Sequence, residues 1–221
     1  MVTRLNSYIL TNDIENKMKE RLHKTRQNEL GFTLCSNQNN IITANGYREG
    51  ESDRIEIDIE ACDKDEKFLG GYHTHPKGNS LASAEDLAHC GVFKAICIGG
   101  VKDNGIRCQI WKQKQISKEY GLIVAKDIKD NKKQPTNKEH KTNFNCTNIM
   151  SILAKKEDIL VGMDKDIDNI KSFLSIINKP LSIDLQNIIT LAGESRDVYS
   201  NKLKEEIENE SKKYYNEVEI K

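Results

Sequence analysis

The sequence has no long apolar run, and this absence excludes the simplest kind of membrane protein. No stretch of it approaches the roughly 20 apolar residues that a transmembrane helix requires. Its first residues also lack an apolar core followed by a small-residue cleavage site, which is the pattern of a secretory signal. We therefore expect a cytoplasmic protein that makes no contact with a membrane.

The sequence also lacks a net charge. Its 34 basic and 34 acidic residues cancel, so the chain as a whole is not attracted to nucleic acid or to an anionic membrane. Hydrophobic residues make up 37% of the chain and charged residues 31%, which is typical of a polar globular protein. The length of 221 residues allows one domain with an appendage, or two small domains.

Paired cysteine motifs are missing as well. None of the six cysteines forms a Cys-x-x-Cys pair, so the sequence does not predict a four-cysteine structural zinc site. Cysteines of cytosolic proteins stay reduced, and we expect most of these to be small buried apolar groups. They are Cys35, Cys62, Cys90, Cys97, Cys108 and Cys146.

The first part of the chain alternates between helical and strand-like patterns. Ile14, Met18 and Leu22 have the spacing of the buried side of a helix, which we predict over residues 12–28. A second helix is predicted to begin at Ser83, a residue type favoured at helix N-caps, and to extend over 83–93. Strands are predicted at 31–35, 40–47, 54–62, 68–75, 94–100, 106–114 and 121–128.

The last part of the chain has a different character. Residues 129–142 are polar and charged, which predicts a linker or an exposed loop. Beyond them, helical spacing of apolar residues recurs to about residue 215. We therefore expect one α/β domain over 1–128, a linker over 129–142 and a small all-helical module over 143–221.

The residues with the clearest chemistry lie in one short segment. His73 and His75 are two positions apart on a predicted strand, so their side chains lie on the same face. Asp86 lies early in the helix that follows, and the intervening loop is long enough to bring it back to the histidines. Three protein ligands with one open position form a catalytic zinc site, where the metal activates water and polarises a carbonyl.

Such a site also needs an oxyanion donor and a general base. Ser83 lies one helical turn before Asp86 and can donate its hydroxyl, although Ser-x-x-Asp is also an ordinary helix capping box. Glu29 directly precedes the strand 31–35 and can act as the base if that strand neighbours 68–75. Alternative bases are Glu49, Glu51 and Glu60.

These residues resemble a known family. The order His-x-His, seven residues, Ser, two residues, Asp is similar to the signature of the JAMM metalloproteases, also called MPN+ or JAB domains, and the lead-in LGGYHTHP resembles theirs. The resemblance spans about residues 5–128. It implies a deaminase-like, mostly antiparallel sheet flanked by helices, with zinc on His73, His75 and Asp86. It also implies that Ser83 stabilises the tetrahedral intermediate and that Glu29 is the general acid/base.

One spacing differs from that family. Two residues usually separate the family's glutamate from a following glycine, whereas only Leu30 separates Glu29 from Gly31. Either the strand begins one residue earlier here, or Phe32 takes the place of the glycine.

The resemblance implies a zinc-dependent peptidase or isopeptidase. Members of the family cleave bonds after the C-terminal tail of ubiquitin or ubiquitin-like proteins, and some prokaryotic members process small sulfur-carrier proteins. We therefore expect a deubiquitinase-like hydrolase with a protein partner, whose extended tail adds to a sheet edge at 54–59. The C-terminal helices could serve partner binding or self-association.

Two other functions remain open. MPN domains without the metal ligands act as scaffolds in multi-subunit complexes, but this sequence retains the ligands. The RadC family, which is associated with DNA repair, has a similar pattern that His75-Pro76-Lys77-Gly78 also fits. The balanced charge and the absence of a helix-turn-helix pattern argue against binding to nucleic acid. The signature of the nucleobase deaminases is absent.

Overall fold

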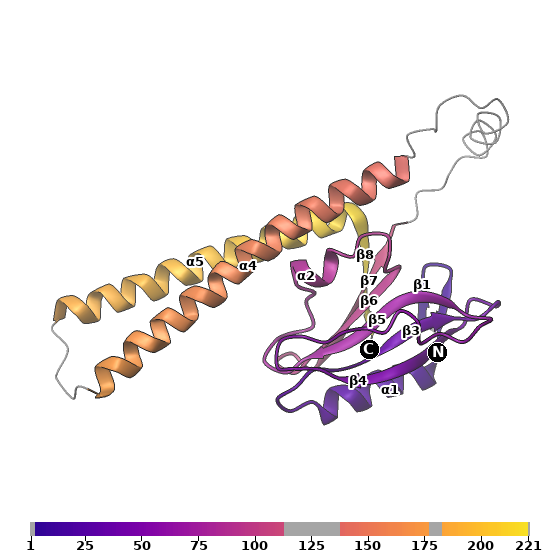
Figure 1. Cartoon of the computed structure of the whole chain (residues 1–221), viewed down its shortest axis with the longest axis horizontal. Helices are drawn as coiled ribbons and strands as arrows, with labels where there is room; N and C mark the ends of the chain where they lie inside the picture. The colour runs from indigo at the N-terminus through magenta and orange to yellow at the C-terminus, as the bar shows by residue number, and fades with distance from the viewer. Residues whose placement is uncertain (1–2, 113–137, 177–182, 221) are drawn as a thin grey trace.

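A computed structural model of the chain describes residues 3–112, 138–176 and 183–220. In these ranges the protein is mixed α/β, with a two-stranded sheet, a mostly antiparallel six-stranded sheet and four helices (Figure 1). The predicted fold class is therefore confirmed at this coarse level.

The six-stranded sheet is the framework on which the other elements pack. Its strand order is β4-β3-β5-β6-β7-β8, and neighbouring strands are antiparallel except for β5 and β6, which are parallel. The short strands β1 (Thr3–Leu5) and β2 (Tyr8–Leu10) form a separate hairpin. The sheet strands are β3 (Leu30–Ser36), β4 (Ile42–Glu49), β5 (Lys67–His75), β6 (Ala95–Gly100), β7 (Gly105–Trp111) and β8 (Tyr215–Ile220).

Helix α1 (Asn12–Lys24) covers one face of the sheet and buries the predicted residues Ile14, Met18 and Leu22. On the sheet side, Tyr72 of β5 points to this helix, and its hydroxyl donates a hydrogen bond to the Met18 carbonyl at 2.7 Å. Because side chains alternate along a strand, the neighbouring His73 points to the opposite face. The metal-ligand candidates therefore lie on the face that α1 does not cover.

A loop over residues 50–66 crosses that opposite face. The strand predicted at 54–62 is wrong, because this segment forms no regular strand. Ile55 and Ile57 are nevertheless turned towards the sheet, whereas Ile59 is 60% exposed. A Cβ atom added at Gly71 would lie 2.7 Å from the Ile57 side chain, and one at Gly31 would lie 3.0 Å from Ile55. The alternation of apolar residues thus reflects packing on a face of the sheet and not a place within it.

Helix α2 (Ala84–Leu87) is much shorter than the helix predicted over 83–93. Gly91 has a φ of 75°, in the region that favours glycine, and the chain turns there before β6. The strands predicted at 94–100 and 106–114 are confirmed as β6 and β7, which pair as an antiparallel hairpin. The strand predicted at 121–128 lies outside the described residues.

Two long helices, α4 (Lys138–Ile176) and α5 (Ile183–Tyr214), form a hairpin that projects past the sheet (Figure 1). The first helix begins inside the segment predicted as a linker over 129–142, and the rest of that segment lies outside the described residues. After α5 the chain continues into β8, which pairs with β7 as the last strand of the sheet. The expectation of an all-helical C-terminal module is therefore wrong for Tyr215–Ile220.

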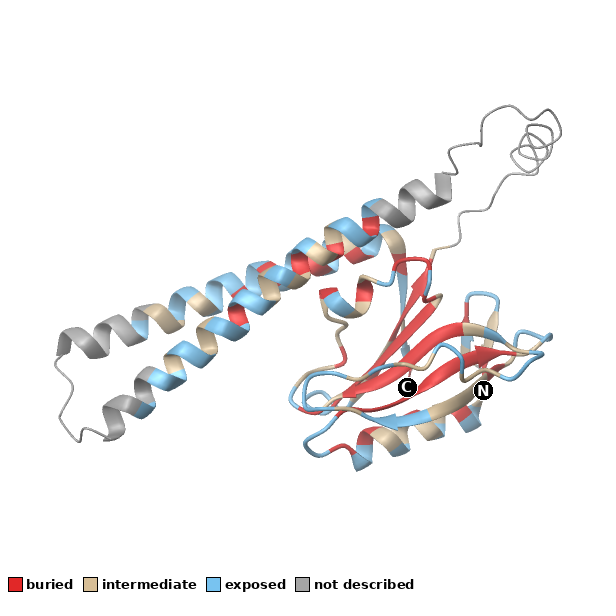
Figure 2. Cartoon of the chain, viewed as in Figure 1, coloured by how far each residue is buried: buried red, intermediate tan, exposed pale blue. Residues whose placement is uncertain are grey.

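The part of this helical hairpin nearest the sheet packs against α2. Leu153 and Leu203, from the two helices, join Leu87 of α2 in one apolar cluster, and the Tyr215 hydroxyl donates to the Leu87 carbonyl at 2.9 Å. Figure 2 shows the buried positions of α4 and α5 where the helices pass α2, and mostly exposed positions further out. The helical hairpin is therefore packed onto the sheet domain over part of its length.

The cysteines form three disulfides, so the prediction of reduced thiols is wrong for this structure. The pairs are Cys35–Cys62, Cys90–Cys146 and Cys97–Cys108, and no cysteine is left free. The partners are 27, 56 and 11 positions apart, and such connectivity cannot be deduced from the sequence alone. Among the described residues, none of the helices has the length and apolar character required to cross a membrane.

Candidate metal centre

The end of β5 presents two histidines on one face of the sheet. The Nε2 atoms of His73 and His75 are 3.2 Å apart. His75 Nδ1 lies 3.2 Å from the Asn79 carbonyl oxygen, which can only accept a hydrogen bond. The neutral His75 ring therefore carries its proton on Nδ1 and keeps the Nε2 lone pair for a metal.

The start of α2 brings Asp86 to this histidine pair. Asp86 Oδ1 lies 3.1 Å from His73 Nε2, and Asp86 Oδ2 lies 3.6 Å from His75 Nε2. Ligand atoms of a tetrahedral site with metal bonds of about 2.0 Å are about 3.3 Å apart. The 3.2 Å between the histidines fits two corners of such a site, and the Asp86 carboxylate reaches both histidines, each through a different oxygen. One ion could be held between the three side chains.

Glu29 approaches the same histidines from β3. Glu29, His73 and His75 have potential ligand atoms within 4.8 Å of one another and form a group that could hold a metal ion. The glutamate is only 5% exposed, and this burial raises the pKa of its carboxyl group, although the two histidines oppose the rise. Two carboxylates thus flank the pair, and Asp86 is the nearer one.

The pairing of β3 with β5 explains how Glu29 reaches the site. The strands are antiparallel neighbours, as the proposed role of Glu29 requires, and Gly31 lies opposite His73. A Cβ atom at Gly31 would lie 2.5 Å from the Tyr72 carbonyl oxygen, so the close approach depends on glycine. Phe32 is fully buried in the core and pairs with Tyr72. Gly31, and not Phe32, is therefore the residue whose backbone lies close to β5 where β3 begins.

Thr74, between the two histidines, fixes the chain beside Glu29. Its side chain is fully buried on the other face of β5, where the hydroxyl oxygen accepts hydrogen bonds from the Leu30 amide at 2.9 Å and the Thr25 hydroxyl at 2.8 Å. Glu29 itself donates its amide to the Glu51 carbonyl at 2.7 Å. The backbone of the glutamate is thus held from two sides.

Ser83 is the N-cap of α2 and contacts Asp86 directly. The Asp86 amide donates to Ser83 Oγ at 3.1 Å, while the Ser83 amide and hydroxyl both approach Asp86 Oδ2, at 2.8 and 2.7 Å. The capping box that the sequence allows is therefore present. It orients the carboxylate towards the histidines, so capping and a role at the site are compatible.

The charged groups of the site shift one another's pKa values. Burial alone would raise the pKa of Asp86, but His73 and His75 hold the pKa of this carboxyl well below its usual range. Burial lowers the pKa of His75, but its hydrogen bond with Asp86 and the nearby Glu29 outweigh this and leave the pKa raised. The site therefore keeps Asp86 ionised, as a metal ligand must be.

The alternative bases are not brought to the centre. Glu49, Glu51 and Glu60 are exposed, and none of them belongs to the potential ligand group. The Glu49 side chain accepts a hydrogen bond from Asn28 instead.

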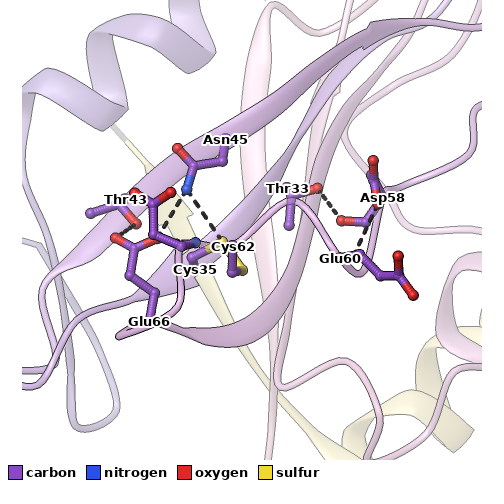
Figure 3. Close-up of a disulfide and its surroundings, with 9 residues drawn as sticks. Thr33, Cys35, Thr43, Asn45, Asp58, Glu60, Cys62 and Glu66 are labelled. Carbon is purple, nitrogen blue, oxygen red and sulfur yellow. Dashed lines mark hydrogen bonds between the residues drawn. A yellow bond between two sulfur atoms is a disulfide. The ribbon is translucent and has the colours of Figure 1, made fainter.

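The loop over 50–66 is fastened beside the centre. The Cys35–Cys62 disulfide joins it to β3, and Thr33 donates its hydroxyl to the Asp58 carbonyl at 2.7 Å (Figure 3). Thr43 and Asn45 of β4 donate to the carboxylate of Glu66, at 2.7 and 2.9 Å (Figure 3). These contacts fix the C-terminal part of the loop, which follows Ile55 and Ile57.

Glu157 of α4 is a functional candidate that the sequence did not indicate. Its Oε2 accepts a hydrogen bond from the Ala84 amide at 2.9 Å, although the two residues are 73 positions apart. Burial raises the pKa of Glu157 to about 7. No local pattern could have revealed it, because its place depends on how α4 packs against α2.

Comparisons with known proteins leave the family undecided. No model of a protein family matches the chain, and no curated protein matches it. A solution structure of the protein DSY2949 from Desulfitobacterium hafniense is similar over 47% of this chain and 84% of that one, at 16% identity and a TM-score of 0.30. Such a low score supports no argument about the fold or the function.

Proposed function

We propose that this protein is a zinc-dependent peptidase or isopeptidase of the JAMM type, with an MPN/JAB-like fold. The observation that carries the proposal is the set of separations between His73, His75 and Asp86, which are 3.1, 3.2 and 3.6 Å. Two imidazoles and one carboxylate are an established ligand set for catalytic zinc. The buried Glu29 beside them supplies the base that a ligand set alone does not.

Each residue has a distinct part in the proposed reaction. His73, His75 and Asp86 would hold the zinc, which when bound lowers the pKa of water and polarises a carbonyl. Glu29 takes a proton from the attacking water and passes it to the amine that leaves. Ser83 has a single O–H, which rotates from Asp86 to donate to the oxyanion of the attacked carbonyl.

The substrate would be a protein with an extended tail, as in the ubiquitin-like class. Ile55 and Ile57 form an apolar wall over β3 and β5 on the face that carries the histidines. An extended aliphatic segment can bury its side chains against such a wall. This wall takes the place of the sheet edge that the sequence suggested at 54–59.

The test combines zinc analysis with cleavage assays. The purified chain, loaded with zinc, is incubated with diubiquitin and with ubiquitin-like fusions, and compared with Glu29→Gln. We expect cleavage by the wild type and a loss of about 100-fold or more in the variant. Equal rates would remove Glu29 from the mechanism, and a wild type that binds no zinc would refute the proposal.

A scaffold function is the second candidate, and the exposed apolar residues of the helical hairpin favour it. Ile152, Ile159 and Val198 are 57%, 57% and 56% exposed. Such residues are common in surfaces that bind other proteins. A complex that forms in sedimentation experiments and is lost on Ile152→Lys with Ile159→Lys, with no cleavage of any substrate, would favour this function over hydrolysis.

The disulfides bear on where the hydrolase would act. The cytoplasmic location that we expected from the sequence implies reduced thiols, whereas disulfides persist mainly in oxidising compartments. All six cysteines are paired here. We therefore propose that the protein acts where thiols are oxidised.

A further inference from the structure

A cavity of about 240 Å³ lies between the metal centre and the helical hairpin. It is smaller than the roughly 300–1,000 Å³ of most small-molecule sites, so its size suits a single side chain. Its walls come from the end of β5, α2, β7, α4, α5 and β8. The lining residues that matter here are His75, Ser83, Leu87, Gln109, Glu157 and Ile207.

The cavity adjoins the proposed reaction centre. His75 and Ser83 line it and also belong to the metal centre. A group seated in the cavity would therefore be part of a substrate whose scissile bond lies at the metal. This inference rests on the proposed function for that connection.

The walls offer both apolar and acidic surface. Leu81, Leu87 and Ile207 provide apolar surface, Glu157, Glu208 and Glu217 provide carboxylates, and the basic residues are Lys204 and His75. Lysine and arginine side chains match both kinds of surface, with an aliphatic stem and a charged head.

The three carboxylates differ in their existing partners. Glu208 is paired with Lys212 at 2.7 Å, and Glu217 accepts from Gln109 at 2.8 Å and lies 3.4 Å from Arg107. Among the described residues, Glu157 has a backbone amide as its partner but no cation. Its hydrogen bond from the Ala84 amide also places this carboxylate beside Ser83, the preceding residue.

We propose that this cavity is a specificity subsite that accepts a lysine or arginine side chain of the substrate beside the scissile bond, with Glu157 as the partner of its charged head. Lys204 is exposed, so its ammonium group can turn to water. The proposal makes basic residues next to the cleaved bond the preferred substrate class.

The test uses binding of small probes to the full-length chain, which does not require cleavage. Nα-acetyl-lysine methylamide, its norleucine analogue and its glutamate analogue are titrated while the amide resonances of the protein are followed by NMR. We expect the lysine probe to bind at least about tenfold more tightly than the norleucine probe. The resonances of Ser83, Gln109 and Ile207 should shift.

The decisive variant is Glu157→Gln. It keeps the side-chain volume and an oxygen that can accept from the Ala84 amide, but it removes the charge. We expect the lysine preference to fall by about tenfold. The matched control is Glu206→Gln on α5, because Glu206 pairs with Lys156 at 2.7 Å and does not line the cavity. This control should retain the preference.

Three results would overturn the subsite. They are equal binding of the lysine and norleucine probes, an unchanged preference in Glu157→Gln, and tighter binding of the glutamate probe. A wild type that cleaves substrates without any preference for basic residues would also refute it, while leaving the proposed function in place. A chain that binds the lysine probe in the cavity but holds no zinc and cleaves nothing would instead refute the proposed function.

Discussion

The metal centre lies between two walls of different chemistry. On one side, the loop over 50–66 presents Ile55 and Ile57, and a disulfide from Cys62 fastens it to β3. On the other side, α4 and α5 present mainly charged residues, and a disulfide from Cys146 fastens them near α2. Under the proposed function, an aliphatic tail would pack on one side of the cleaved bond and a basic side chain on the other.

The two walls also support different parts of the site. The loop holds the backbone of Glu29 through the Glu51 carbonyl, so it positions the proposed base. The helical wall holds α2 through the Ala84 amide and through packing on Leu87, so it positions Asp86. Changes on the two sides should therefore affect catalysis and metal binding separately.

The largest expected effect is on the loop side, at Glu29. Glu29→Gln keeps the shape of the side chain but cannot accept a proton, so we expect kcat to fall by about 100- to 10,000-fold. Zinc content should not change, because Asp86 and the histidines remain. Steady-state kinetics with metal analysis of the same sample measures both. A fall in zinc content that parallels kcat would make Glu29 a ligand.

The next effect compares the two disulfides that fasten the walls. Replacing Cys90 and Cys146 by alanine should lower the free energy of unfolding by about 2–4 kcal/mol. The Cys35–Cys62 disulfide closes a shorter loop, 27 against 56 residues. Its removal should therefore cost about 0.6 kcal/mol less.

Denaturant unfolding of both variants with the wild type measures this order, and mass spectrometry of the native chain under alkylation counts the free thiols. Six alkylated cysteines in the native protein would contradict the cross-links in both walls.

A smaller effect is expected at Thr74, which links the histidine strand to the Glu29 segment. Thr74→Val removes an acceptor for the Leu30 amide and the Thr25 hydroxyl, both of which are buried, and should cost about 1–3 kcal/mol of stability. Because Glu29 then loses its support, kcat should fall while zinc binding persists. Thr74→Ser keeps the hydroxyl and should restore kcat. A serine variant as slow as the valine variant would refute this role.

The smallest effect is expected at the apolar wall. Ile57→Ala removes part of a half-buried side chain, so KM for substrates with an aliphatic tail should rise roughly threefold to tenfold, with kcat little changed. Glu56→Ala, at the exposed neighbouring position, is the control. An unchanged KM in the isoleucine variant would show that the tail does not use this wall.

What the sequence could predict depended on how local each feature is. His73, His75, Ser83 and Asp86 lie within one strand, loop and helix start, so their spacing alone was enough to expect them together. Glu29 needed one further assumption, that its strand neighbours the histidine strand, and the observed pairing of Gly31 with His73 meets it.

The features that sequence analysis missed depend on contacts between distant segments. The alternation around Ile55 and Ile57 looks the same for a strand and for an extended loop on a sheet face, so the strand was predicted wrongly. The last strand, Tyr215–Ile220, buries only its two end residues, which is too weak a pattern to detect. Glu157 reaches the site only because α4 packs against α2, as its bond to the Ala84 amide shows.

The most direct test of the account is the zinc content of four chains. Wild type should hold about one zinc ion per chain, Glu29→Gln should hold the same, and Asp86→Ala should lose it. Ser83→Ala, which removes the helix cap but no ligand, should keep its zinc and so controls for damage to α2. Zinc that is absent from the wild type, or that is lost in Glu29→Gln and kept in Asp86→Ala, would contradict the proposed centre.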